Sequence, residues 1–455
     1  MSSTSWANNR LSGWGRYPIV ETRCARPERH SEAREIICNH GDDDGGLLAH
    51  GLGRSYGDAA LIEDGSAVLT RRLDRMLDFD PAAGVLDVEA GVSLAEILDI
   101  FVPRGWFPPV VPGTKFVTVG GAIGCNIHGK NHVHAGCFGD HVRSIELLCA
   151  DGQIRRCGPD QHEDLFWATV GGMGLTGLIL SAEIELYSID SGAIVMESTR
   201  FENLAEFYEV SREYDDWLHT VAWIDCTTSG DRMGRGIFMA GRHASGPEAA
   251  RVKSGIVDRI AAFGQQLVDG RAFESNLLLN KASIRAFNEL YFRRHPAGTK
   301  RSVVSHEPFF FPLDAVDNWN YIYGDRGFLQ YQLVVDDREA IRAVLTEITD
   351  SGMASFLAVL KEFGDHDHGG LSFPCAGTTL ALDFPNYGTP VFELMDRLDT
   401  IVADAGGRLY LGKDARLSRD QFRRMYPQWN EWKAVRDEWD PDRVFCSELA
   451  KRLGL

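Results

Sequence analysis

Gly51-Leu-Gly-Arg-Ser-Tyr-Gly-Asp58 is the stretch from which the fold of this 455-residue chain can be read. Its three glycines follow the apolar run Leu47-Leu-Ala49, and a loop without Cβ atoms can turn several amides toward one anion. Arg54 and Ser55 add a positive charge and a hydroxyl group. A glycine-rich turn without a ligand is the better explanation for such a stretch when it stands alone, so the rest of the chain must decide.

A second glycine-rich stretch, Pro112–His132, follows about sixty residues later. Glycine recurs in it at positions 113, 120, 121 and 124, which allows a flat or phosphorylated ligand to approach the backbone closely. Two such loops on one domain predict a dinucleotide that lies extended across it.

A third stretch, Gly172-Met-Gly-Leu-Thr-Gly177, spells the G-x-G-x-x-G pattern of a Rossmann nucleotide site. That site requires a strand, a turn and then a helix whose N-terminus holds the pyrophosphate. Here the alternating run Leu178–Leu186 continues as a strand. We therefore reject a Rossmann site for NAD.

The composition excludes several classes of protein. Asp and Glu (65) outnumber Lys and Arg (47), and the formal charge of −18 argues against a nucleic-acid-binding protein. No run approaches about 18 consecutive apolar residues, so no transmembrane helix is expected. The start, Met1–Trp6, lacks the apolar core of a signal peptide. The nine cysteines are scattered and form no C-x-x-C pair, which favours a reducing cytoplasm over a disulfide framework or a zinc ribbon.

The pattern of short runs predicts an α+β fold in three parts. Residues 8–190 hold β-type runs separated by glycine, together with a helix at Ser93–Phe101 that begins with a Ser93–Glu96 capping box. Residues 191–405 hold longer amphipathic helices between strands. The basic, turn-rich stretch 276–305 is interpreted as a loop. Residues 406–455 are too few to fold alone and must dock onto an earlier domain.

His128, His132 and His134 raise the question of a metal site. The H-x-x-x-H spacing would place two imidazoles on one helical face, but Gly129 weakens a helix and no Glu follows His128. We expect no catalytic metal.

The motifs together resemble, over nearly the whole length, the FAD-dependent decaprenylphosphoryl-β-D-ribose 2′-oxidases of the vanillyl-alcohol-oxidase superfamily. The matching motifs are Leu11–Arg16, Gly51–Asp58, Val119–His132, Phe138–Arg143, Phe166–Gly172, Gly327–Gln332, Ser372–Pro374, Gly407–Tyr410, Lys413–Arg416 and Arg443–Phe445.

The resemblance implies an FAD-binding domain at 8–190, an inserted substrate-binding domain at 191–405, and a segment at 406–455 that returns to the FAD domain. The residues it implies for cofactor binding are Gly53, Arg54, Ser55, Tyr56, Gly57, Gly113, Thr118, Val119, Gly120, Gly121, Cys125, Asn126, Ile127, His128, Ile179 and Tyr410. Covalently flavinylated relatives carry a histidine where this chain has Tyr56, so non-covalent FAD is expected.

The implied reaction is oxidation of a secondary alcohol, in which FAD accepts the hydride and the protein must position the carbinol and take up the hydroxyl proton. The resemblance implies catalytic roles for Lys413, Tyr56 and His128. The substrate-binding residues it implies are Lys130, Gln330, Gln332, Trp223, Phe310, Thr379 and Ala381. A lysine can act as the base only where burial or nearby charge lowers its pKa.

One departure from the family concerns the substrate wall. Actinobacterial members carry Trp-Asn-x-Cys where this chain has Thr378-Thr-Leu-Ala381, and a tyrosine in place of Phe310. The reaction type is therefore better determined than the lipid chain of the substrate.

Three functions stay open on the sequence. The first is a polyprenylphosphoryl-ribose 2′-oxidase, which implies a separate NAD(P)H-dependent short-chain reductase, a quinone as a candidate electron acceptor, and a cytoplasmic protein that can lie peripherally at the inner membrane face. The second is an alditol or sugar oxidase that uses oxygen. The third is a flavin-binding protein without turnover, which Lys413 and the two glycine loops argue against.

Overall fold

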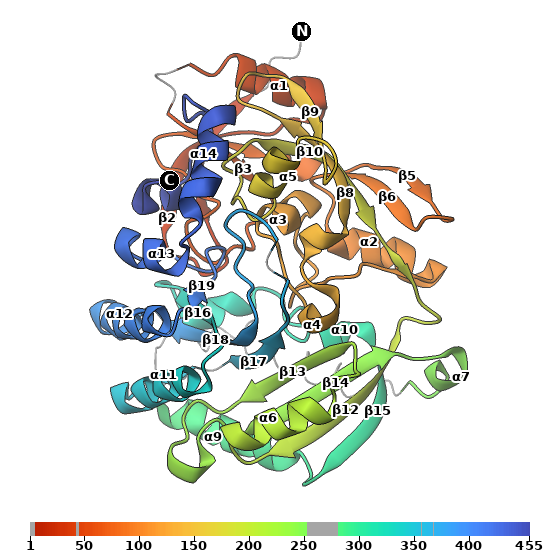
Figure 1. The fold of residues 1–455 in the computed structure, drawn as a ribbon, viewed down its shortest axis with the longest axis vertical. Coiled ribbons are helices and arrows are strands. Elements are labelled where there is room, and N and C mark those ends of the chain that lie inside the picture. The colour runs from red at the N-terminus through yellow and green to blue at the C-terminus, as the bar shows by residue number, and fades with distance from the viewer. Residues whose placement is uncertain (1–4, 42–44, 253–280, 356, 367) are drawn as a thin grey trace.

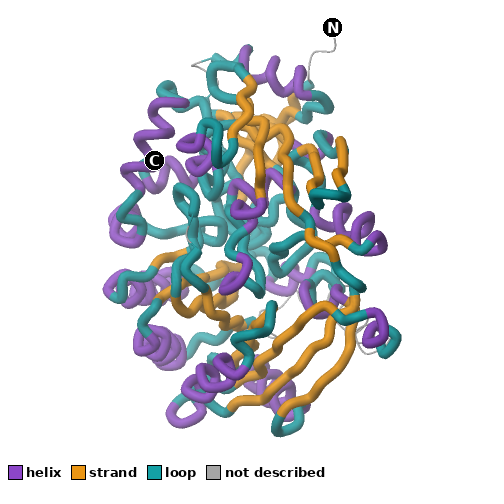
Figure 2. Tube along the Cα trace, turned by 45° about the vertical axis from the view of Figure 1, so that its right-hand side comes forward, coloured by secondary structure: helices purple, strands orange, loops and turns teal. Residues whose placement is uncertain are grey.

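The computed structural model describes residues 5–41, 45–252, 281–355, 357–366 and 368–455. Two smaller sheets and a large sheet occupy opposite ends of the molecule, with helices packed around them (Figures 1 and 2). The chain is α+β, as the sequence predicts. In the described residues, no helix is both long and apolar enough to cross a membrane.

The N-terminal half forms two sheets and a short ribbon. The first sheet has the order β1-β2-β4-β3, in which β4 pairs in parallel with β2 and β3. The second sheet, β5-β6-β10-β8-β9, is antiparallel. The strands of this half are β1 (Trp6–Ser12), β2 (Ile19–Ala25), β3 (Leu47–His50), β4 (Ser66–Leu69), β5 (Met76–Asp80), β6 (Val85–Glu89), β7 (Trp106–Phe107), β8 (Val142–Leu148), β9 (Ile154–Cys157), β10 (Leu178–Glu185) and β11 (Tyr187–Ser188).

The later part of the chain forms an eight-stranded antiparallel sheet with the order β15-β12-β14-β13-β17-β18-β16-β19. Its strands are β12 (Ala193–Phe201), β13 (His219–Ile224), β14 (Gly236–His243), β15 (Thr299–Ser305), β16 (Phe328–Val335), β17 (Ala358–Phe363), β18 (Gly377–Pro385) and β19 (Arg408–Leu409).

Helices cover the outer faces and the cross-connections. They are α1 (His30–Cys38), α2 (Leu94–Phe101), α3 (Val119–Gly124), α4 (His132–Ala135), α5 (Glu163–Thr169), α6 (Leu204–Glu213), α7 (Gly246–Ala249), α9 (Lys281–Arg294), α10 (His306–Phe310), α11 (Arg338–Ser351), α12 (Thr389–Asp404), α13 (Arg419–Met425), α14 (Trp429–Trp439) and α15 (Glu448–Leu453). The Ser93–Glu96 capping box is present at the start of α2, as predicted.

One local prediction is wrong. The stretch 276–305, interpreted as a loop, forms α9 and β15 over its described residues, and 276–280 lie outside them. Arg285, Arg293 and Arg294 are exposed, while Ile284, Asn288 and Phe292 repeat every four residues and are buried. The three buried residues recur with the period of a helix, but the many charged residues between them obscure this pattern in the sequence.

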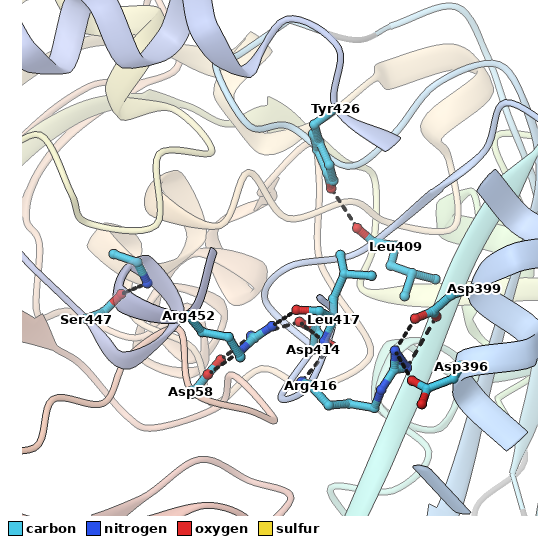
Figure 3. Close-up of polar contacts among 11 residues, drawn as sticks. Asp58, Asp396, Asp399, Leu409, Asp414, Arg416, Leu417, Tyr426, Ser447 and Arg452 are labelled. Atoms are coloured by element: carbon cyan, nitrogen blue, oxygen red, sulfur yellow. Dashed lines mark hydrogen bonds and ion pairs between the residues drawn. The ribbon is translucent and has the colours of Figure 1, made fainter. Parts of the chain in front are cut away.

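The C-terminal segment packs against the N-terminal half. The Leu47 amide donates to Val444 O at 2.7 Å, and the Cys446 amide donates to Leu47 O at 2.9 Å. Arg452 forms a two-pronged contact with Asp58, at 2.8 and 2.9 Å (Figure 3). These contacts hold the chain around residues 444–452 against the N-terminal half, while β19 adds the outermost strand to the large sheet beside β16. The boundaries at 190 and 405 stay predictions.

Candidate active site

A cavity of about 530 Å³ is lined by residues from both halves of the chain and from the C-terminal segment. That volume lies within the range of about 300–1,000 Å³ for small-molecule and cofactor pockets. The two glycine loops of the sequence analysis both border it, together with the face of the large sheet that β16, β17 and β18 present.

Close packing explains the glycines of the first loop. A Cβ at Gly51 would lie 2.5 Å from Thr118 Oγ1, and a Cβ at Gly57 would lie 1.7 Å from Asp414 O. Gly53 adopts a φ of +63°, a conformation that other residues rarely take. The first loop is thereby held against the second loop and against the C-terminal segment.

The cavity walls fit a long ligand that carries phosphate. A Cβ at Gly113 would meet nothing within 4 Å, so the backbone there is open to the cavity. The Arg54 guanidinium lies 3.9 Å from the Trp14 ring centroid, and its Nε donates to Phe116 O at 3.1 Å. A fixed positive charge beside bare backbone is suited to a pyrophosphate group.

Strand register brings a set of side chains to one face of the large sheet. Gln332 pairs with Ala381, and Ala381 pairs with Val359 on the next strand. Two residues further along each strand, and so on the same face, Thr379 lies opposite Lys361. Because opposite residues on neighbouring strands point to the same side, these side chains form one wall, and all of them line the cavity.

His128 is held on this wall as a neutral imidazole. The Gln332 side-chain amide donates to His128 Nε2 at 2.9 Å and to Thr379 Oγ1 at 3.3 Å. Burial, helped by the charges of Lys361 and nearby groups, lowers the pKa of His128 well below its usual value. Its buried Nδ1 has no hydrogen-bond partner among the described residues.

Lys413 lies against the ring of Tyr56. The Lys413 Nζ is 3.7 Å from the Tyr56 ring centroid, and both residues line the cavity. Burial lowers the pKa of Lys413 to about 7, while the charge of Asp383 acts to raise it. Burial raises the pKa of the Tyr56 hydroxyl well above its usual value. Near neutral pH, Lys413 therefore exists in both protonation states and Tyr56 keeps its proton.

Two residues that the sequence analysis missed belong to the same cluster. Lys361 lines the cavity, its Nζ donates to Gly129 O at 3.2 Å, and burial and the charges of Lys130 and Lys413 lower its pKa to about 7. Asp383 accepts a hydrogen bond from Gln330 at 2.6 Å, and burial raises its pKa to about 7.

A sequence signal existed for both missed residues. Lys361 stands in the apolar run Ala358-Val-Leu-Lys-Glu-Phe363, and Asp383 stands in the apolar strand around Leu382 and Phe384. A charged residue on a buried strand is costly unless it is paired or functional.

Most of the residues expected at the site line the cavity. They are Gly53, Arg54, Ser55, Tyr56, Gly113, Thr118, Gly120, Gly121, Cys125, Ile127, His128, Ile179, Gln330, Gln332, Thr379, Ala381, Tyr410 and Lys413. Met173, Gly174 and Gly177 of the rejected Rossmann pattern also line it, although the strand β10 follows them directly.

Other expected residues lie behind the cavity walls. Gly57, Val119, Asn126, Lys130, Phe310 and Trp223 are absent from the cavity lining. Asn126 donates to Ser372 Oγ at 2.7 Å and accepts from the Gly139 amide at 2.9 Å. Its side chain therefore connects two segments of the chain by hydrogen bonds.

Lys130 and Trp223 have different partners from those expected. Lys130 Nζ donates to Phe310 O at 3.0 Å, and burial lowers its pKa to about 8. Trp223 packs on Tyr291, with ring centroids 4.7 Å apart. Neither residue borders the cavity in this conformation.

Within the described ranges, no group of three or more His, Cys, Asp or Glu side chains is arranged to hold a metal ion.

Comparison with known proteins gives the family. Residues 22–158 match the family described as FAD binding domain, and residues 381–453 match the family described as D-arabinono-1,4-lactone oxidase. The chain is 38% identical over 468 aligned residues to the decaprenylphosphoryl-β-D-ribose oxidase of Mycolicibacterium smegmatis, with both chains covered in full. The chain belongs to this oxidase family.

More distant relatives of this oxidase cover less of it. A Streptomyces coelicolor protein, described as uncharacterised and in the mprA 5′ region, is 34% identical over 80% of the chain and 100% of its own length. The Delta(24)-sterol reductase of Rattus norvegicus is 34% identical over 24% of the chain and 22% of its own length.

The cofactor of this oxidase is FAD. The observations that fit it are the open backbone at Gly113 and the fixed charge of Arg54. In the non-covalent binding that we propose, the glycine loops hold the dinucleotide and no histidine occupies position 56.

Proposed function

We propose that this oxidase converts the 2′-hydroxyl of a polyprenylphosphoryl-β-D-ribose to a 2′-ketone. The observation that carries the proposal is Lys413, a half-buried lysine with a pKa of about 7 that faces the cavity beside Tyr56 and Gln330. FAD, when bound, accepts the hydride from the 2′-carbon.

In this proposal, the neutral form of Lys413 takes up the proton of the 2′-hydroxyl. The hydroxyl loses H⁺ to Nζ, and the hydride acceptor that bound FAD would supply for the 2′-carbon balances the C=O double bond that forms. Asp383 then stabilises the ammonium form of Lys413, because its charge acts to raise the pKa of that lysine. Gln332 and neutral His128 orient the sugar from the sheet wall.

The charge of the cluster supports a phosphorylated substrate. Lys361 and Lys413 line the cavity, and the electrostatic effect of Lys130 reaches Lys361 from behind the wall. The charges of Lys130 and Lys413 lower the pKa of Lys361, and a phosphodiester at the wall would relieve that repulsion.

The rest of the proposed pathway follows from the product. A 2′-keto sugar returns to a secondary alcohol only by accepting hydride, so a separate NAD(P)H-dependent short-chain reductase completes an epimerisation to arabinose. A quinone is the proposed acceptor for the electrons of the reduced cofactor.

A second candidate is an FAD-dependent oxidase of soluble alditols or sugar lactones. The match of residues 381–453 to the D-arabinono-1,4-lactone oxidase family favours it, and so does the small wall of Thr379 and Ala381.

The two functions are separated by anaerobic reduction of the flavin. Farnesylphosphoryl-ribose, free ribose and xylitol are mixed with the oxidised enzyme in a stopped-flow instrument. We expect the phosphorylated lipid to bleach the flavin fastest and free ribose to react poorly, since binding of remote groups positions the reacting carbon. Fastest reduction by xylitol would replace the first function with the second.

A further inference from the structure

The cavity and α9 share one face of the large sheet. The row that begins at Gln332, Ala381 and Val359 continues across β13 and β14 through two more pairs, Val359 with Trp223 and Trp223 with Ile237. The first three residues of the row line the cavity. The last two are buried with Phe292 of α9. α9 therefore lies beside the cavity, at the end of the row away from His128.

The inner side of α9 is firmly attached to the sheet. Asn288 donates to Asp225 at 2.8 Å, and Arg235 bridges Asp225 and Glu289 at 2.9 and 2.5 Å. Ile284 and Phe292 are also buried on this side. The helix is thus held in a fixed orientation, with its opposite side facing outward; α6 covers the other face of the same strands (Figure 1).

The outer side of α9 combines exposed apolar and basic side chains. Leu290 is 70% exposed and Phe287 is 42% exposed. The Arg293 side chain is 75% exposed, and Arg294 is exposed on the same side of the helix. Such a combination is typical of helices that lie in the interface of a bilayer.

The charge of this region is opposite to that of the whole chain. Residues 281–301 contain six Lys and Arg residues and one acidic residue, Glu289, while the chain carries −18. Lys300 and Arg301 of this set are exposed on β15, at the edge of the sheet. A local basic surface on an acidic protein is complementary to anionic phospholipids.

We propose that the outer side of α9 docks onto an anionic lipid bilayer, with Leu290 and Phe287 among the acyl chains and the arginines against the phosphates. The purpose of this docking rests on the proposed lipid-linked substrate, because it would bring the Val359 end of the cavity to the surface that holds the polyprenyl chain. The binding itself does not depend on that function.

Flotation with vesicles tests the proposal. The FAD-loaded full chain is mixed with phosphatidylcholine vesicles, with and without phosphatidylglycerol. We expect binding to the anionic vesicles only, weakened by salt, and a fall of at least about tenfold for Leu290→Glu and for Arg293→Glu with Arg294→Glu. Leu77→Glu is the matched control, since Leu77 is 45% exposed on β5 of the other half of the chain.

The possible outcomes are distinct. The proposal is overturned if the wild type does not float with anionic vesicles, if the α9 variants bind like the wild type, or if Leu77→Glu loses binding equally. Flavin reduction by farnesylphosphoryl-ribose in solution should be unchanged in every variant. If that substrate fails with the wild type, the proposed function fails while the vesicle result still decides the docking.

Discussion

The Nζ of Lys413 lies 3.7 Å from the centre of the Tyr56 ring, so the C-terminal segment places its lysine directly on the first glycine loop. The contact stabilises the ammonium form through the ring electrons, while burial favours the neutral amine. The balance leaves a lysine that can gain and lose a proton near pH 7.

Lys413→Ala should keep FAD and lose reduction by substrate. The glycine loops that hold the dinucleotide do not depend on the Lys413 side chain, whereas loss of a general base typically costs about 10²–10⁴-fold in rate. Anaerobic stopped-flow measures the bleaching, and the flavin absorbance measures occupancy. Lys433→Ala, which removes a surface lysine paired with Asp437, is the control. An unchanged rate in Lys413→Ala would remove this residue from the mechanism.

The rate of flavin reduction should rise with pH through about 7, because the neutral form of Lys413 is the base and its pKa is about 7. Asp383 acts to raise that pKa, so Asp383→Asn should move the rising limb to lower pH. Stopped-flow reduction across a pH series compares the two enzymes. A limb that stays in place would show that Asp383 acts only on the fold.

Acid precipitation should release all FAD into the supernatant. Tyr56 occupies the position of the flavinylated histidine in covalent relatives, and a phenol that keeps its proton is a poor nucleophile. Absorbance of the supernatant and the mass of the intact chain check this. Flavin that stays with the polypeptide would contradict it.

Ala381→Cys should make the cavity reactive toward thiol-directed electrophiles that leave the wild-type cavity unmodified. The Ala381 side chain lines the cavity, and the thiol already there, Cys125, is half-buried and has a pKa that desolvation raises, which keeps it protonated. Peptide mapping after electrophile treatment locates the adduct. Cys375, which lies outside the cavity lining, serves as the internal reference, and modification of wild-type Cys125 that substrate blocks would count against this expectation.

Arg452→Leu should lower the free energy of unfolding by about 3 kcal/mol, since it leaves two acidic groups, Asp58 and Asp414, without their arginine. Burial acts to raise the pKa of Asp414, but Arg452 and Arg416 outweigh it and the pKa is lowered. The stabilisation is therefore present above about pH 4 and disappears as the pH falls. Urea unfolding at pH 7 and at about pH 3 measures the difference, which should be smaller at the lower pH.

The glycine loops of the cofactor-binding part could be predicted from the sequence because each glycine meets a requirement of the local backbone. Gly51, Gly53 and Gly57 are required by a turn and by two close approaches that no other residue permits. The residues that form the cavity wall on the large sheet were harder to predict, since strand pairing brings them together. The row from Gln332 to Trp223 depends on the register of four strands, and nothing in the local sequence of β17 states which strand lies beside it.

Trp223 shows the limit of reasoning by motif position. Its place on the row is consistent with a substrate wall, but α9 covers it, and the sequence analysis had interpreted α9 as part of a loop. The Trp223 side chain lies on the expected face of the sheet, but its neighbour there is α9 and not the cavity.

The docking of the C-terminal segment has a consequence for how the enzyme is made. The amide of Leu47 donates to Val444 O and that of Tyr56 donates to Gly412 O, so the first glycine loop is completed by residues translated long after the loop itself. While the ribosome is still adding those residues, the N-terminal half lacks its closing partner and Lys413 has not been delivered. Tight retention of the cofactor must therefore follow synthesis of these later residues, and a ribosome that stalls before residue 412 would yield a product unable to retain it.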